Sequence, residues 1–137
     1  MENRIADKNN LRFLSNQSLK KIVVHGVNIN SLLSTDDMGL KEPVQKEIVF
    51  GVLRFFFFLN ANLSRYLERD LKNKNMDIKI LILMGMYEIK FMRTPSYAAI
   101  NETVEVCYPL GKAWAKGLVN AVLRKMVTND SKLGVIE

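Results

Sequence analysis

The 137-residue sequence contains one cysteine, one histidine and only three prolines. A single cysteine excludes an intrachain disulfide and a cysteine-rich metal site. Cys107 falls on the apolar side of its predicted helix, a position that favours an inert buried thiol over a nucleophile. His25, the one histidine, has no second ligand near it in the sequence. We therefore expect no metal site, no cofactor site and no catalytic residue in this chain.

Long hydrophobic runs are also missing. The two most apolar stretches, residues 48–59 and 78–92, are interrupted by charged residues and are shorter than the ~20 residues of a membrane span. The first ten residues are polar and lack the apolar segment of a signal peptide. No glycine-rich phosphate loop, internal repeat or alternation of strands and helices occurs. These absences predict a cytoplasmic protein without a membrane partner.

Basic residues exceed acidic ones by 20 to 14, which gives a formal net charge of +6. Such a charge favours an anionic partner, with RNA the commonest for a small basic domain. The alternative is that the excess lysine only keeps a helical protein in solution. The candidate RNA contacts are Arg4, Lys8, Arg12, Lys20, Lys21, Arg54, Lys116 and Arg124. The first five also fit a solvated helix face, and Arg54 also fits an ion pair with Glu47 or Glu88.

Apolar residues recur at helical spacing through most of the chain, which predicts an all-α fold, a compact bundle of about six or seven helices. We expect helices over about residues 10–25, 41–59, 60–71 and 78–93, and two shorter ones around residues 99–107 and 115–126. Asn9 or Asn10 is expected to cap the first helix, Gly26 to end it, and Asp77 to cap the fourth. Residues 28–39 read as a surface connection. The predicted domain covers residues 10–128, with a flexible segment at 1–9 and, at 129–137, a tail or the start of a linker.

The fourth predicted helix, residues 78–93, is apolar on nearly all sides, so we expect it in the middle of the bundle. Residues 77–83 alone could also be read as a β-strand, but the run is too long and too charged for one. Four successive phenylalanines, residues 55–58, cannot all face one core at 100° per residue. At least one of them should be exposed or covered by something outside this chain. Gly51 is disfavoured inside a helix and is therefore predicted to mark a close packing contact.

Residues 95–105 (PSYAAINETVE) and 116–124 (KGLVNAVLR) closely resemble the signature of the NusB-like helical domain. Residues 50–54 (FGVLR), 84–95 (MGMYEIKFMRTP) and 10–12 (NLR) are similar to one branch of that family. In that branch the domain precedes the catalytic part of the ribosomal RNA small-subunit methyltransferase B enzymes, which methylate C5 of cytosine in 16S rRNA. The resemblance covers about residues 10–127. Glu102 and Asn120 lie where the signature is densest, and with Gly51 they are expected to be structural residues.

The resemblance implies a non-catalytic accessory domain whose partners are ribosomal RNA and a downstream catalytic domain. That downstream domain, and not this chain, would use S-adenosylmethionine. A free-standing transcription antitermination factor that binds RNA with a small ribosomal protein is the first alternative, although its usual arginine-rich N-terminal segment is not found here. A purely structural interaction module is the second.

Overall fold

The computed structural model describes residues 10–26 and 42–133. The helices in these ranges are α1 (Leu11–His25), α3 (Pro43–Arg54), α4 (Phe56–Ser64), α5 (Met76–Phe91), α6 (Ser96–Glu105) and α7 (Lys116–Leu133), with single 3-10 turns η2 (Asn73–Asn75) and η3 (Ala113–Ala115). The described part of the chain has no strand, so the all-α prediction is confirmed and the strand reading of residues 77–83 is excluded. The predictions for residues 1–9 and 28–39 lie outside the described residues.

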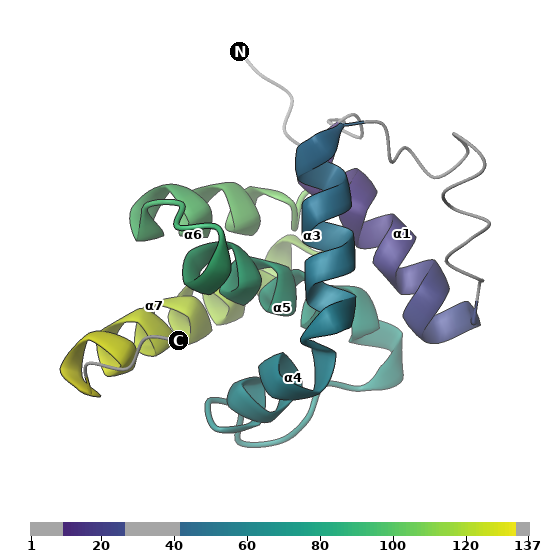
Figure 1. Ribbon diagram of the computed structural model, residues 1–137. Coiled ribbons are helices and arrows are strands. Elements are labelled where there is room, and N and C mark those ends of the chain that lie inside the picture. Colours follow the sequence, from purple (N-terminus) through teal and green to yellow (C-terminus); the bar gives the residue numbers. More distant parts are fainter. Residues whose placement is uncertain (1–9, 27–41, 134–137) are drawn as a thin grey trace, which may run out of the picture.

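Helix α5 is the centre of the domain. It packs against α1, α3 and α4, and also against α6 and α7, which form a separate pair beside it (Figure 1). Every residue from Asp77 to Glu88 is buried, because neighbouring helices surround α5. This confirms the expected central helix and shifts its bounds from residues 78–93 to 76–91. A helix that is apolar all round is stable in water only in such a position.

Helix α1 begins and ends as its sequence predicts. The Asn10 side chain accepts hydrogen bonds from the backbone N–H groups of Arg12, at 2.8 Å, and Phe13, at 3.1 Å. Gly26 ends the helix with a φ of +70°, a left-handed conformation that glycine adopts without strain. The Asn16 amide, fully buried, donates to the Asp77 backbone carbonyl at 2.9 Å and so ties α1 to the start of α5.

The prediction of one continuous helix over residues 41–59 is wrong, because the helix breaks at Phe55. Helix α3 ends at Arg54, Phe55 leaves the helical conformation with φ −107° and ψ 23°, and α4 continues at an angle of 73°. The bend directs Phe55 onto Phe91 of α5, with ring centroids 4.5 Å apart, while Phe57 stays 86% exposed. Helix α4 then stops at Ser64, so the predicted helix over residues 60–71 is also wrong. A single continuous helix could not place the four phenylalanine rings in such different environments, from stacked on α5 to exposed.

Among the described helices, none is by itself both long and apolar enough to cross a bilayer. Only α3 and α4 taken together reach that length and hydropathy, and they do so across their 73° bend.

The C-terminal pair confirms the two short signature helices, with changed bounds. Residues 106–112 turn between them, and Gly111 adopts a φ of +74°. Helix α7 continues to Leu133, past the predicted domain end at residue 128. Asp77 is not the cap of α5, because the helix starts one residue earlier. Its carboxylate instead accepts a hydrogen bond from Lys112 Nζ at 2.7 Å, which joins η3 to α5.

Candidate nucleic-acid interface

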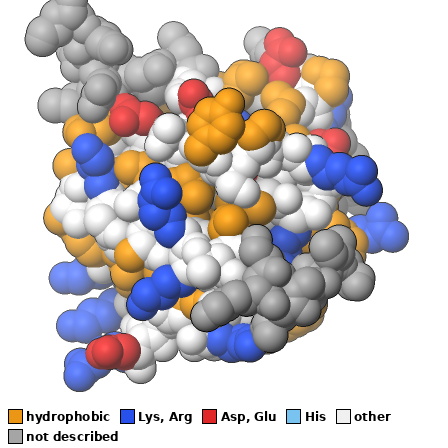
Figure 2. All heavy atoms as spheres, turned by 90° about the vertical axis from the view of Figure 1, so that its left-hand side faces the viewer, with side chains coloured by type: hydrophobic (Ala, Val, Ile, Leu, Met, Phe, Trp, Pro, Cys, Tyr) orange, Lys and Arg blue, Asp and Glu red, His pale blue; other side chains and the backbone are white. Residues whose placement is uncertain are grey.

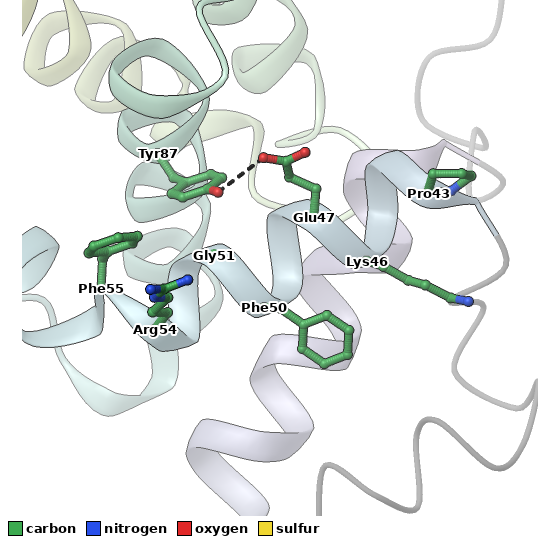
Figure 3. Close-up of a pocket in the computed structure, with 8 residues that line it drawn as sticks. All are labelled: Pro43, Lys46, Glu47, Phe50, Gly51, Arg54, Phe55 and Tyr87. Carbon is green, nitrogen blue, oxygen red and sulfur yellow. Dashed lines mark hydrogen bonds between the residues drawn. The ribbon is translucent and has the colours of Figure 1, made fainter.

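A concave feature that combines cations with aromatic rings lies along α3. We call it the α3 groove, a hollow of about 440 Å³ lined by Pro43, Lys46, Glu47, Phe50, Gly51, Arg54, Phe55 and Tyr87 (Figure 3). Most of these residues come from α3, and Tyr87 comes from α5. Because Gly51 has no side chain, the backbone of α3 approaches the Tyr87 ring closely. A Cβ atom built on Gly51 would lie 2.1 Å from Tyr87 Cζ.

Aromatic rings form one end of the α3 groove. Phe55 stacks on Phe91 at a centroid distance of 4.5 Å, and Tyr87 stacks on Phe91 at 5.1 Å. The Arg54 guanidinium lies 5.5 Å from the centre of the Phe55 ring. Phe50 is half-buried and stands at the opposite rim from Tyr87 (Figure 3). The groove thus presents aromatic surface beside a cation, a combination that favours flat or anionic ligands.

One carboxylate also lines the groove. The Tyr87 hydroxyl donates a hydrogen bond to Glu47 Oε2 at 3.2 Å. Burial, and then the neighbouring Glu47 carboxylate, raise the pKa of the Tyr87 phenol above its ordinary value. The hydroxyl is therefore a stable donor at neutral pH and holds the Glu47 side chain in place. Arg54 does not form the ion pair with Glu47 that the sequence allowed as an alternative to RNA contact.

Arg12, predicted as an RNA contact, forms an ion pair within the domain. Its guanidinium binds both carboxylate oxygens of Glu88, with Nε 3.0 Å from Oε1. The Glu88 carboxylate is 4% exposed, and the Arg12 side chain is 22% exposed. Arg12 Nη1 also lies 3.8 Å from Glu102, whose side chain is more than half exposed. A buried carboxylate needs this cation, so Arg12 stabilises the position of Glu88 in the core.

The other predicted cations lie on three different helices. Lys20 is half-buried and Lys21 is exposed on α1, Arg54 is exposed at the end of α3, and Lys116 and Arg124 belong to α7. Arg4 and Lys8 lie outside the described residues. The described candidates thus come from α1, α3 and α7 and from no single element.

Helix α7 carries two of the predicted RNA contacts, Lys116 and Arg124, which with Asn120 we call the α7 ridge. Lys116 Nζ donates to the Tyr108 hydroxyl and lies 4.7 Å from the centre of that ring, so this lysine is partly covered. Arg124 is exposed, and its Nε donates to Asn120 Oδ1 at 3.0 Å. On the face that includes α6 and α7, Lys and Arg side chains are widely spread, whereas acidic side chains lie mainly in its upper half (Figure 2). Arg124 is thus the ridge residue best placed to contact an external anion.

Trp114 and Cys107 differ sharply in exposure. Trp114, the one tryptophan of the sequence, is 60% exposed. Cys107 is fully buried, as expected, and burial raises the pKa of its thiol to about 11. In residues 10–26 and 42–133, no group of three or more His, Cys, Asp or Glu side chains could hold a metal ion.

The sequence profile of the NusB family matches residues 10–128, which is most of the chain. The chain belongs to the NusB family. Its α5-centred fold, with α6 and α7 as the C-terminal pair, is thus the structure of a NusB domain.

Several curated relatives of this NusB domain carry one name. The ribosomal RNA small subunit methyltransferase B of Pseudomonas syringae is 35% identical over 118 residues, and that of Erwinia tasmaniensis is 32% identical over 127 residues. A probable ribosomal RNA small subunit methyltransferase B of Coxiella burnetii is 30% identical over 115 residues. These alignments cover 84%, 90% and 84% of this chain, but only 26%, 30% and 26% of the relatives. The NusB domain thus spans less than a third of the proteins it matches.

Sequence analysis singled out four residues of the α3 groove, for separate reasons: Glu47, Gly51, Arg54 and Phe55. It gave no functional role to Lys46, Phe50 or Tyr87. One signal was available, because Lys46, Phe50 and Arg54 are four residues apart and must share one side of a helix. No sequence signal places Tyr87 opposite Gly51, since the two residues lie on different helices.

Proposed function

We propose that this NusB domain is a non-catalytic accessory domain of a 16S rRNA (cytosine-C5) methyltransferase, where it helps to position ribosomal RNA. The observation that carries the proposal is the set of relatives named ribosomal RNA small subunit methyltransferase B. They match 84–90% of this chain with only about a quarter to a third of their own length. The remaining length of such a protein would hold the S-adenosylmethionine-dependent chemistry. The net charge of +6 supports an RNA partner.

The exposed aromatic side chains support a second part of the proposal, that the NusB domain packs against the catalytic part of the same protein. Phe57 is 86% exposed and Phe58 is 46% exposed, and both lie in the first turn of α4. Apolar side chains grouped on a surface in this way are typical of an interaction site. The cytoplasm is the compartment that fits a ribosomal RNA substrate.

Titration of a 16S rRNA fragment with this chain at several salt concentrations tests the RNA role. Each phosphate contact contributes about 0.7–0.9 to the slope of log K against log salt concentration. We expect Arg124→Gln to lower the slope by about that amount. Arg69→Gln is the matched control, because Arg69 is exposed in the segment after α4 and carries the same charge. Absence of any salt-dependent binding by the wild-type chain would contradict the proposed function.

The free-standing antitermination factor is tested separately. That function requires a stable complex with a small ribosomal protein, which size-exclusion chromatography of the two purified proteins would detect. Under the proposed function we expect the proteins to elute apart, with RNA affinity unchanged when the ribosomal protein is added.

A further inference from the structure

We propose that the α3 groove binds one unpaired base of single-stranded RNA, with Lys46 and Arg54 contacting the phosphates on either side of that base. This inference rests on the proposed function, because it assigns a site to the RNA that the domain is proposed to bind. It concerns a surface distinct from the α7 ridge, since the groove is built by α3 and α5.

The shape of the groove suits a base. Its volume of about 440 Å³ lies within the range of small-molecule sites and is open along α3. The Tyr87 ring occupies the space beside Gly51 that a side chain would fill, and Phe50 stands at the opposite rim of the hollow (Figure 3). Single-stranded RNA is recognised chiefly by stacking of its splayed-out bases on aromatic side chains. Phe50, which is half-buried, offers a ring that a base can reach.

The charges of the groove fit a nucleotide better than an uncharged apolar ligand. Lys46 and Arg54 are both exposed, and they are eight residues apart on one helix, which separates them by about 12 Å along the axis. They therefore lie toward the two ends of the hollow, where the phosphates that flank a bound base would be. Two cations facing two phosphates provide the charge complementarity that an RNA strand requires.

Glu47 is the one acid that lines the groove, and its position is compatible with a base. One of its oxygens accepts the hydrogen bond from the Tyr87 hydroxyl, at 3.2 Å, beside the rim of the hollow. A carboxylate accepts hydrogen bonds from the exocyclic amino group of cytosine. We therefore use cytidine as the test base.

The experiment compares two single-stranded probes of equal length, a cytidine hexanucleotide and a ribose-phosphate hexamer that lacks all bases. Both are titrated with the 137-residue chain at about 50 mM salt, where phosphate contacts are strongest. Three variants are used: Phe50→Leu, the double variant Lys46→Gln/Arg54→Gln, and the control Arg69→Gln/Lys72→Gln. The control removes the same charge from two exposed residues that do not line the groove. Thermal unfolding of each variant checks that it is folded.

We expect the wild-type chain to bind the cytidine probe at least five- to tenfold more tightly than the baseless probe. Phe50→Leu should abolish most of that difference and leave the affinity for the baseless probe unchanged. The groove double variant should weaken both probes and lower the salt slope by about 1.4, which is about 0.7 for each of two single-strand phosphate contacts. The control variant Arg69→Gln/Lys72→Gln should lower the salt slope by less than the groove double variant does. If Phe50→Leu fails to fold, the groove double variant still tests whether the groove binds RNA, because it changes only exposed side chains.

Equal affinity of the wild-type chain for both probes would overturn the proposal, as would a Phe50→Leu variant that still distinguishes them. If the 16S rRNA fragment nevertheless binds, the proposed function stands and only the groove assignment fails. If neither the fragment nor the hexamers bind, both proposals fail. A glutamate-rich peptide that binds the groove, while the groove variants leave the cytidine probe unaffected, would assign the groove to a protein segment and also overturn the proposal.

Discussion

Arg12 and Glu88 are 76 residues apart in the sequence, and their side chains form a two-bond ion pair that joins α1 to α5. The carboxylate is 4% exposed, so the pair lies largely outside the reach of water. A bidentate guanidinium satisfies both oxygens of a carboxylate at once, which makes this the strongest of the side-chain ion-pair geometries. The pair sets the position of α1 on the central helix.

Removing one partner of this pair should destabilise the domain strongly. Arg12→Gln leaves the Glu88 carboxylate buried without its cation, and we expect a loss of about 3 kcal/mol in the free energy of unfolding, the lower end for a broken buried pair because Arg12 is partly exposed. Urea denaturation measures this change. A loss below about 0.5 kcal/mol would show that the pair contributes like an ordinary surface salt bridge.

The double variant Arg12→Met/Glu88→Leu is the matched control for this prediction. It removes both charges, so no unpaired carboxylate remains, and it should be more stable than Arg12→Gln by at least about 1 kcal/mol. If both variants lose the same stability, the loss comes from packing and not from the unpaired charge.

Gly51 and Gly117 offer a second matched pair, because both lie in helices but have different surroundings. An added Cβ at Gly51 would lie 2.1 Å from Tyr87 Cζ, whereas nothing lies within 4 Å of one at Gly117. Gly51→Ala should therefore destabilise the domain by about 1–3 kcal/mol, because overpacking exceeds the gain in helix propensity. Gly117→Ala should stabilise it by up to about 1 kcal/mol. Denaturation midpoints in urea that move in the same direction for both variants would contradict this account.

Local patterns were sufficient to predict the central helix and the ends of α1, but not the bend after α3. Apolar residues on every side of residues 78–93 can only be buried from all directions, and Asn10 and Gly26 act on their own neighbours in the chain. The bend at Phe55 instead coincides with a tertiary contact, the stacking of the Phe55 ring on Phe91 of α5. Such a contact is invisible to helical periodicity, which made residues 41–59 look continuous.

Local sequence patterns are equally insufficient for the charged residues of the candidate site. The sequence made Arg12 and Arg124 candidate RNA contacts alike, and Arg124 is exposed in the structure. Arg12 and Lys112 are instead bound to acids of α5, at Glu88 and Asp77. Both acids lie more than thirty residues away from their partners, so charge spacing along the chain cannot reveal the pairs.

The phenylalanines at the bend should differ sharply in their contribution to stability. Phe57→Ser changes a side chain that is 86% exposed, and we expect the free energy of unfolding to change by less than about 0.5 kcal/mol. Phe55→Ala removes a ring stacked on Phe91 and should cost about 3 kcal/mol. Urea denaturation of the two variants under the same conditions measures both. A large loss for Phe57→Ser would mean that this ring is buried in solution, for example between two copies of the chain.

Cys107 should be unreactive in the folded chain. Its side chain is fully buried, and burial raises the pKa of its thiol from 9.0 to about 11. At pH 8 the thiolate fraction is therefore about a hundredfold lower than in the unfolded chain, and only the thiolate attacks an alkylating reagent. We expect iodoacetamide to modify Cys107 at least a hundredfold more slowly in buffer than in denaturing urea. Because the folded pKa is the higher one, the stability gained from the protonated thiol is present below pH 9 and is lost as the pH rises toward 11. Equal rates in buffer and in urea at pH 8 would contradict the burial of Cys107 against α5.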